Sequence, residues 1–451
     1  MRKVLTIAGS DSGGGAGIQA DLKTITVLGA YGMSVITAIT AQNSLGVKAI
    51  QKIDTEIIEK QIDCIFEDFG ADAVKTGMLF NAEILSRVTK RLKEYRVKNL
   101  VVDPVMVAKS GDYLLDKEGR IALKEKLVPQ AFLITPNLYE ASELTGIKVD
   151  SVAKMKKAAK VINEVGAKNV LIKGGHLRGD AVDVLYGGDC FYEFREKRIN
   201  TVHTHGVGCT LSAAIATFLA RKYNLHTSIG KAKNYVTQAI KGASPLGKGI
   251  SPVNHFADMA QRLYNYGRFE LLKEIKDAVA ILKVEKISRL IPEVGSNLAF
   301  CLPGARDLND VAAIPGRIIR LGHDVVTVAE PEFGVSSHVG KIVLTLNRYD
   351  EVFRSAMNIK FTEEILKACK SLEFRIAEFS RKKEPKNVRI NEGKSLEWGV
   401  DSVLKREGGI PDIIFDRGGI GKEAMVRVTG KDPADVANKV IRINRGIQKK
   451  T

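Results

Sequence analysis

THGVGCTLSAAIA, residues Thr204–Ala216, joins a glycine-rich turn to the start of a helix and decides how the rest of the chain is interpreted. Gly206 and Gly208 leave the backbone open to a closely approaching ligand, and the small residues of Thr210–Ala220 are compatible with a helix. The free N–H groups and positive dipole end of such a helix bind anions. Cys209 is the first functional side chain, and a thiol at a helix N-terminus is expected to have a lowered pKa and to accept a proton. The stretch predicts a phosphoryl-transfer site; a tightly packed Gly/Ala core helix is the alternative.

The composition predicts a multidomain protein of the cytoplasm. A chain of 451 residues is too long for one ordinary domain, and its 45% hydrophobic and 27% charged residues are typical of globular proteins. No apolar run approaches the roughly 18–20 residues that span a bilayer. Asp11 and Asp21 follow the short apolar N-terminal run too closely for a signal peptide. The 5 cysteines lack CxxC spacing, so we expect a reducing compartment and no metal cluster. Because no apolar run is long enough, we expect no membrane.

The net charge of +17, from 69 Lys+Arg against 52 Asp+Glu, suits nucleic acid, anionic substrates or a lysine-rich solvated surface. The basic residues are dispersed and aromatic residues make up only 6%, without the basic strip interleaved with aromatics that single-stranded nucleic acid prefers. We therefore expect small phosphorylated substrates and no nucleic acid. The sequence is compatible with a monomer and with a homo-oligomer.

In the N-terminal two thirds, short apolar strands alternate with amphipathic helices, which predicts an α/β fold with a mostly parallel sheet. The predicted strands are Val4–Ala8, Ser34–Ala41, Ala71–Lys75, Asn99–Val102, Ala131–Thr135 and Val170–Ile172. The predicted helices are Ile18–Leu28, Ile57–Phe69 and Ala82–Tyr95. The glycine run Gly9–Gly17 after the first strand is no dinucleotide fingerprint, because Ile18 stands where its last glycine belongs.

The ends of these strands carry the residues of a Mg²⁺–nucleotide site. Asp103 follows one strand, Glu140 lies just past another, and Lys173 precedes a Gly-Gly pair. Phosphoryl transfer needs positioning and charge neutralisation, which two acids, a lysine and a glycine anion hole supply. Gln42 also ends a strand; its amide suits a heteroaromatic ring with an amine beside a ring nitrogen, or equally caps a loop. Gly242–Gly249 almost spells a phosphate-binding loop, but Gly249 replaces the required hydroxyl residue, so we expect a helix-ending turn.

The segment from residue 1 to about 256 resembles the hydroxymethylpyrimidine/phosphomethylpyrimidine kinases of thiamine biosynthesis, which have a ribokinase-like fold. The matching stretches are AGSDSGGGAGIQADLKT, ITAITAQNSLGV, VKTGML, DPVMVAKSG, ITPNLYEA, LIKGGH, HGVGCTLSAAIA and SPVNHF. The resemblance implies ATP-dependent phosphorylation of 4-amino-5-hydroxymethyl-2-methylpyrimidine to its phosphate and then to its diphosphate, with Mg²⁺.

The resemblance also implies roles for individual residues. Gln42 would contact the aminopyrimidine edge, and the ring pocket would be lined by Gly9, Ala16, Met78 and Val105. The substrate's hydroxyl proton would pass to Cys209, and the amides from Gly206 through Gly208 to Cys209 would hold the transferred phosphate. Mg²⁺ would be served by Asp103 and Glu140, and ATP phosphates by Lys173. The family usually has Thr where Val207 stands, so any hydroxyl contact to phosphate is lost here while the backbone amides are kept.

The C-terminal third is predicted to be a second, smaller α/β domain. Its sequence changes character around Ala257–Phe269, and an amphipathic helix is expected over Glu270–Leu282. Further on, the predicted strands are Leu298–Leu302, Val325–Ala329, Ile342–Leu346, Arg375–Phe379 and Asp412–Phe415, and the predicted helices are Thr362–Leu372, Leu396–Arg406 and Asp432–Asn444. Basic residues on glycine-rich turns suit a diphosphate and phosphate site, although a solvated turn explains any single one. We place the domains at 1–266 and 267–451.

This third resembles archaeal-type thiamine-phosphate synthase domains through LPGARDLNDVAAIPGRI, EPEFGVSSHVGKIVL, AMNIK and FDRGGIGKEAMVRVTG. The resemblance implies condensation of the pyrimidine diphosphate with 4-methyl-5-(2-phosphoethyl)thiazole. Arg317 and His338 would be catalytic, and lesser candidates are Asn358, Arg417 and Lys422. Two alternatives stay open: a non-catalytic thiamine-phosphate sensor in this domain, and a pyridoxal or sugar kinase in the first.

Overall fold

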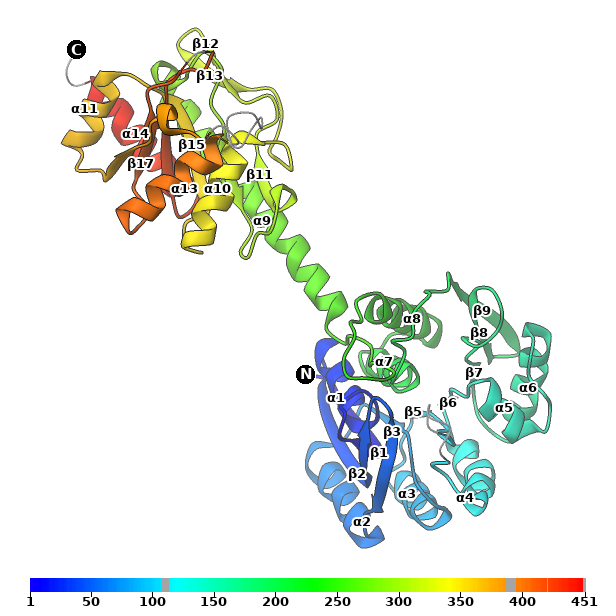
Figure 1. Cartoon of the computed structure of the whole chain (residues 1–451). Coiled ribbons are helices and arrows are strands. Elements are labelled where there is room, and N and C mark those ends of the chain that lie inside the picture. Colours follow the sequence, from blue (N-terminus) through cyan, green and yellow to red (C-terminus); the bar gives the residue numbers. More distant parts are fainter. Residues whose placement is uncertain (108–112, 386–394, 420, 449–451) are drawn as a thin grey trace. The chain divides into compact units, whose positions relative to one another are not determined.

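The computed structural model of the chain (Figure 1) describes residues 1–107, 113–385, 395–419 and 421–448. The chain forms two compact units, Met1–Gln261 and Arg262–Thr451. The long helix α9 (Ala257–Val284) contains the division between them and includes the amphipathic helix expected over Glu270–Leu282. Within the described part of the chain, no helix is both long enough and apolar enough to cross a membrane.

The first unit is built on a nine-stranded sheet in the order β3-β2-β1-β4-β5-β6-β7-β8-β9. Its strands are β1 (Lys3–Asp11), β2 (Tyr31–Asn43), β3 (Gly46–Lys52), β4 (Ala73–Thr76), β5 (Leu100–Val102), β6 (Leu133–Ile134), β7 (Val170–Ile172), β8 (Ala181–Gly187) and β9 (Cys190–Glu196). The six neighbouring strands β2, β1, β4, β5, β6 and β7 pair in parallel. Antiparallel strands extend the sheet on both sides, β3 next to β2 and β8 with β9 next to β7. The predicted, mostly parallel α/β fold is confirmed.

Helices cover both faces of this sheet. They are α1 (Gly17–Val27), α2 (Thr55–Cys64), α3 (Ala82–Glu94), α4 (Lys117–Ala122), α5 (Leu138–Thr145), α6 (Val152–Glu164), α7 (Val207–Ala220) and α8 (Leu225–Lys241), with short helical turns η1 (Ile65–Phe69), η2 (Leu123–Leu127) and η3 (Val128–Gln130). Side chains alternate across a strand: Leu100 and Val102 pack against the helices from α2 to α6, while Val101 packs against α7 and α8. Burial on both faces explains why these strands are continuous apolar runs.

The second unit has a mixed seven-stranded sheet in the order β14-β11-β10-β15-β18-β17-β16. Its strands are β10 (Leu298–Cys301), β11 (Val311–Ala313), β14 (Glu332–Phe333), β15 (Ser355–Lys360), β16 (Ile376–Glu378), β17 (Ile413–Asp416) and β18 (Met425–Gly430), and β12 (Ile318–Leu321) with β13 (Asp324–Thr327) forms a separate hairpin. The helices are α10 (His338–Tyr349), α11 (Glu363–Ser371), α13 (Ser395–Glu407) and α14 (Pro433–Gln448), with turns η4 (Ile287–Leu290), η5 (Leu308–Asp310) and η6 (Arg381–Lys383). A second α/β domain is therefore confirmed.

One predicted strand is wrong. Ile342–Leu346 lies inside helix α10, because the apolar positions extend beyond the five-residue run with helical spacing. Val339, Ile342, Val343 and Leu346 are buried on one side of α10, which is the i, i+3, i+4, i+7 pattern of an amphipathic helix. A short β-branched run seen alone does not separate the two structures.

Candidate functional site

In the first unit, the sequence-predicted acids and lysine lie at the carboxyl edge of the parallel strands. The register pairs Ile7 with Thr76, Thr76 with Val102, and Val102 with Ile134, so these strands end side by side. Asp103 follows β5 directly and Lys173 follows β7 directly. Ligands of open α/β sheets bind at this edge. The fold thus gathers into one region the groups that the sequence supplies one strand at a time.

Asp103 and Lys173 form an ion pair that is almost closed to solvent. Nζ of Lys173 lies 2.8 Å from Oδ1 of Asp103, and the Asp103 side chain is 2% exposed. Ser212 on α7 donates to the other carboxylate oxygen at 3.3 Å. Burial favours a raised pKa for Asp103, but Lys173 and then Lys75 outweigh it and lower this pKa. Asp103 is therefore held ionised.

Glu140 lies beside this pair at the start of α5. It forms a capping box with Asn137: Oδ1 of Asn137 accepts from the Glu140 N–H at 2.9 Å, and the Glu140 carboxylate accepts from the Asn137 N–H at 2.7 Å. Burial, together with the charge of Asp103, raises the pKa of Glu140 to about 7 against the opposing effect of Lys173. No group of three or more metal-ligating acidic, histidine or cysteine side chains occurs among the described residues. Two nearby carboxylates are nevertheless the donor set typical of Mg²⁺ held jointly with nucleotide phosphates.

The glycine loop before α7 reaches this cluster. A side chain at Gly208 would place its Cβ 3.3 Å from Nζ of Lys173, so the loop backbone passes close to the lysine. Gly206 caps α7 with φ 80°, and a Cβ there would lie 1.8 Å from the carbonyl oxygen of Gly15. Only glycine permits both this conformation and this approach. The starts of α1 and α7 are thereby brought together.

Cys209 lies where these two helix starts meet. Its thiol accepts a hydrogen bond from the backbone N–H of Gly17, the first residue of α1, and the side chain is partly exposed. The expected lowering of its pKa is wrong for the chain without ligands. Burial raises the pKa of Cys209 to about 11, Asp21 and Asp103 act in the same direction, and Lys75 and the Gly17 N–H oppose them. The helix start alone does not outweigh burial beside two acids.

The buried pair of Lys75 and Asp21 beneath Cys209 was not predicted. Nζ of Lys75 lies 2.8 Å from Asp21, both side chains are 0% exposed, and Thr6 donates to the same carboxylate oxygen at 2.6 Å. Burial favours a lowered pKa for Lys75, but Asp21, Cys209 and Asp103 together raise it, so the ammonium stays charged. A lysine at the end of an otherwise apolar strand was the available signal in the sequence.

The predicted ring-pocket residues lie around the glycine loop. Gly9 is buried, and a Cβ there would come within 3.0 Å of the sulfur of Met78. The Ala16 N–H donates to Asp11 at 2.8 Å just before α1, and the Val105 N–H donates to the Asp103 carbonyl at 2.8 Å. Each of these four residues lies within three residues of a strand end or a helix start.

Gln42 is the next-to-last residue of β2 and contacts a histidine that the prediction did not single out. Its amide lies 3.2 Å from Nε2 of His205, and that same ring nitrogen lies 3.1 Å from Oδ2 of Asp11. Ser12 donates its hydroxyl to the Gln42 carbonyl at 2.7 Å. Gln42, the residue expected to contact the substrate ring, thus contacts both the loop after β1 and the loop before α7.

In the second unit, Arg317 and Asn358 lie on either side of Gly295. Arg317 follows β11 with φ 69°, and its guanidinium donates to the Val294 carbonyl. A Cβ on Gly295 would lie 3.3 Å from that of Arg317, and the Asn358 amide donates to the Gly295 carbonyl at 3.1 Å. A positive φ is costly for arginine, and such strain concentrates at functional positions. The two predicted residues therefore both contact the segment of Val294 and Gly295.

The other two lesser candidates are already engaged. Arg417 is exposed and pairs with Glu363 at 2.6 Å and Glu378 at 3.3 Å, and Lys422 donates to Ser395 at 3.0 Å.

A more deeply buried cluster next to them was missed by the sequence reasoning. Arg381 lies 2.6 Å and Arg427 2.7 Å from the Asp416 carboxylate. Burial favours a raised pKa for Asp416, but Arg427 and Arg381 lower it, so the carboxylate is held ionised.

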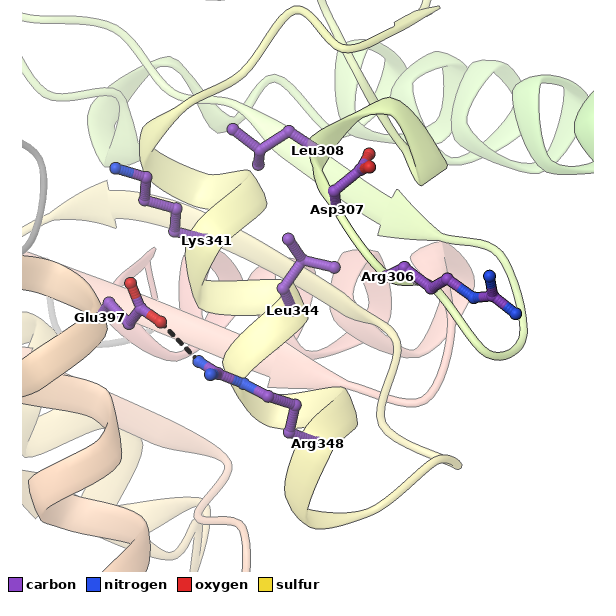
Figure 2. A pocket seen from close by; sticks show the side chains of 8 residues that line it. Arg306, Asp307, Leu308, Lys341, Leu344, Arg348 and Glu397 are labelled. Atoms are coloured by element: carbon purple, nitrogen blue, oxygen red, sulfur yellow. Dashed lines mark hydrogen bonds and ion pairs between the residues drawn. The ribbon is translucent and has the colours of Figure 1, made fainter.

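His338 is the exposed first residue of α10, and Oγ of Ser337 lies 3.3 Å from its Nδ1. Among the described residues, no hydrogen bond joins His338 to Arg317. Lys341, three residues later, lies on the same side of the helix. It borders a hollow of about 260 Å³ (Figure 2), in which Arg348 pairs with Glu397 at 2.7 Å and the remaining lining comes from Ala305, Arg306, Asp307, Leu308 and Leu344. The hollow therefore lies along the side of α10 that carries His338.

Two family models match this chain. Residues 11–254 match phosphomethylpyrimidine kinase, and residues 274–442 match thiamine-phosphate synthase ThiN. A hydroxymethylpyrimidine/phosphomethylpyrimidine kinase of Bacillus subtilis is 47% identical over 257 residues, which cover 56% of this chain and 95% of that protein. The thiamine biosynthesis bifunctional protein ThiED of Geobacter sulfurreducens is 53% identical over 253 residues, which cover 56% of this chain and 52% of that protein. The matched part is thus about half of that bifunctional relative.

Solved structures similar to the first unit include two pyridoxal kinases. The ADP complex of the Bacillus subtilis enzyme aligns with a TM-score of 0.54 and 43% identity over 58% of this chain and 99% of that one. The Staphylococcus aureus enzyme in complex with AMP-PCP and pyridoxal aligns with a TM-score of 0.54 and 37% identity over 57% of this chain and 94% of that one. They have the ribokinase-like fold expected from the sequence.

Proposed function

The chain belongs to the phosphomethylpyrimidine kinase family and carries a ThiN thiamine-phosphate synthase domain, and from this premise we propose that its two units catalyse consecutive steps of thiamine biosynthesis. The first unit phosphorylates 4-amino-5-hydroxymethyl-2-methylpyrimidine twice with ATP. The second joins the resulting diphosphate to 4-methyl-5-(2-phosphoethyl)thiazole and releases pyrophosphate. The product of the first unit is the substrate of the second, which gives the fusion a chemical reason.

The observation that carries the kinase proposal is the position of Cys209 at two helix starts, next to a charged cluster. Gly206, Gly208 and Cys209 offer backbone N–H groups to the transferred phosphate, and Lys173 offers a cation beside them. Bound Mg²⁺ would neutralise phosphate charge, with Asp103 and Glu140 as the residues suited to hold it. Val207 supplies no hydroxyl, so the hydrogen-bond donors of this anion hole are backbone N–H groups.

Cys209 is the proposed acceptor of the substrate's hydroxyl proton. Because burial raises the pKa of this thiol to about 11, the thiol is protonated at neutral pH. Lys75 and the Gly17 N–H are the groups that favour the thiolate.

A Cys209→Ala variant tests this role. We expect kinase turnover to fall by about two orders of magnitude, the usual contribution of a positioned general base, while the fold is kept. Cys190→Ala, at an exposed cysteine of the same unit, is the matched control. Turnover in Cys209→Ala close to that of the control would remove the cysteine from the mechanism.

In the second unit, Arg317 and His338 are the proposed catalytic residues. Departure of pyrophosphate builds negative charge on the leaving group, so preorganised cations stabilise the transition state more than the ground state. Incubating the chain with the aminopyrimidine, the thiazole phosphate and Mg-ATP tests both units at once. Thiamine phosphate is the expected product; accumulation of the diphosphate alone would instead support a thiamine-phosphate-sensing second domain.

Pyridoxal phosphorylation is the second candidate for the first unit, favoured by the 43% identity to a pyridoxal kinase of known structure. Competition between the aminopyrimidine, pyridoxal and ribose for limiting enzyme decides between them. We expect the aminopyrimidine to be preferred, because the Gln42 amide offers a donor and an acceptor side by side. Preferential turnover of pyridoxal or ribose would overturn the assignment.

A further inference from the structure

The Asp11 carboxylate is a fixed hydrogen-bond acceptor at the end of β1. Its Oδ1 accepts from the Gly13 N–H at 2.8 Å, and its Oδ2 accepts from the N–H groups of Gly15 at 3.0 Å and Ala16 at 2.8 Å. Burial favours a raised pKa for Asp11, but the hydrogen bonds from His205 and from the loop backbone outweigh it and lower this pKa. The carboxylate is ionised and has no proton to donate.

The contact between Asp11 and His205 fixes the proton on the imidazole. Oδ2 of Asp11 lies 3.1 Å from Nε2 of His205, so that ring nitrogen must carry the proton and donate it. A protonated ring nitrogen has no lone pair left to accept another hydrogen bond. In the structure Nε2 of the Gln42 amide lies 3.2 Å from the same nitrogen, which sets donor against donor; exchanging the amide's oxygen and nitrogen removes this conflict and turns the oxygen toward His205.

Thr40, on the other side of the amide, imposes the same orientation. Its hydroxyl donates to the Ser10 carbonyl at the shorter distance of 2.9 Å, and its Oγ1 lies 3.5 Å from Oε1 of Gln42, the position that the amide nitrogen takes once the amide is turned. Since the hydroxyl has one proton, its oxygen is an acceptor on that side. The amide nitrogen satisfies this position and the amide oxygen does not.

We infer that His205, held by Asp11, fixes the orientation of the Gln42 amide and so sets which hydrogen-bonding pattern the kinase site accepts. His205 is a positioning residue: it acts through Gln42 and selects for a ring with an acceptor nitrogen beside a donor amine. A ring with the reversed pattern, such as the 4-oxo analogue with N–H at the ring, meets donor against donor and acceptor against acceptor. This inference rests on the proposed function, because it takes Gln42 as the residue that reads the substrate.

The test compares kcat/KM for the 4-amino substrate and its 4-oxo analogue. In His205→Ala the amide is free to turn, so we expect the preference for the amino compound to fall about tenfold, the effect of one or two hydrogen bonds. His205→Gln keeps an N–H donor facing both partners and should retain the preference. His203→Ala, at the other histidine of this loop, is the matched control and should behave as wild type.

A double variant shows whether His205 acts through Gln42. If it does, Gln42→Ala/His205→Ala has the same preference as Gln42→Ala alone, because the residue being oriented is gone. The inference would be overturned if the double variant lost preference by the product of the two single-variant losses. An unchanged preference in His205→Ala would overturn it as well.

The proton position can be measured without any substrate, which separates this inference from the proposed function. Nitrogen-15 NMR of histidine-labelled enzyme should show Nε2 of His205 protonated at neutral pH. An unprotonated Nε2 would overturn the inference whichever compound the enzyme phosphorylates. Failure of the proposed function would instead appear as absent turnover of the aminopyrimidine, with the NMR result unaffected.

Discussion

At the residue scale, neighbours decide the protonation of the key side chains. Cys209 has the helix-start position that ordinarily favours a thiolate, yet burial near Asp21 and Asp103 raises the pKa of its thiol. The carboxylates of Asp103 and Glu140 lie in one cluster, but the pKa of Asp103 is lowered and that of Glu140 is raised. Lys173 pairs directly with Asp103, so it stabilises the charge of Asp103 more than that of Glu140. Groups whose environments separate their pKa values are typical of active sites.

His255 makes the stability of the first unit depend on pH. Its Nε2 lies 3.0 Å from the Thr210 hydroxyl on α7, and burial, with a smaller effect of Lys23, lowers its pKa to about 4. As the pH falls from about 6.5 to 4, the unfolded chain binds a proton at this histidine and the folded chain does not, so stability present at neutral pH is lost. From this difference in pKa we expect a loss of up to roughly 3 kcal/mol at this residue.

Urea unfolding followed by far-ultraviolet circular dichroism at pH 7 and pH 4.5 measures this effect. His255→Gln keeps a polar side chain without a titrating proton, so its free energy of unfolding should fall less over the same interval. His226→Gln, at an exposed histidine of the same unit, should follow wild type. Equal pH dependence in wild type and His255→Gln would contradict the assignment.

At the element scale, the anion hole depends on two helix starts held in contact by glycines. Gly206 approaches Gly15 so closely that a Cβ added to Gly206 would lie 1.8 Å from the Gly15 carbonyl oxygen. The contact therefore leaves no room for any side chain. This contact joins the loop before α1 to the loop before α7, although the two loops lie far apart in the sequence. Local sequence predicted each helix start but not their convergence.

Gly206→Ala should therefore displace the loop and lower kinase turnover about a hundredfold, since misplacement of reacting groups by about 1 Å has effects of this size. Gly29→Ala is the control: Gly29 has the same φ of 80°, but no atom lies within 4 Å of the position that a Cβ would take there. It should cost only the conformational strain of about 1–2 kcal/mol and leave turnover unchanged. Turnover and urea midpoints of both variants, measured side by side, check this; similar losses of activity would show that strain, and not the contact, matters.

Elements with a clear hydrophobic periodicity were predicted well, and so were the polar residues that follow them. The strand at Val170–Ile172 was predicted with its observed bounds, and its following Lys173 reached the site. The segment Ile342–Leu346 was assigned wrongly, because a run of five residues, four of them apolar, fits a strand and a buried helix turn equally well. The strands β3, β8 and β9 were missed: exposed positions interrupt an apolar run in β3 and β9, and Asp183 interrupts it in β8.

At the scale of the whole molecule, the proposed pathway runs through two active sites in one chain. If each unit works through its own residues, a defect in one site leaves the other functional. Cys209→Ala should make thiamine phosphate from added pyrimidine diphosphate, whereas Arg317→Ala/His338→Ala should stop at the diphosphate.

Mixing these two full-length variants with the aminopyrimidine, thiazole phosphate and Mg-ATP should restore thiamine phosphate formation after a lag, because the diphosphate must diffuse between molecules. Time courses by chromatography check this, with each variant alone as the control. Synthesis by the Arg317→Ala/His338→Ala chain at the wild-type rate would remove those residues from the synthase site.

Apolar periodicity and glycine turns are local signals, so the α/β class, the two-domain order and the residues at the central strand ends could be predicted from the sequence. The stretch Thr204–Ala216 already marked a helix start suited to phosphate. Only the tertiary structure decided what surrounds Cys209: the buried pair of Lys75 and Asp21, the second helix start at Gly17, and the raised pKa of the thiol. It likewise joined Asp11, Gln42 and His205. Burial and charge act through space, so residues distant in sequence set the chemistry of a motif that is itself continuous.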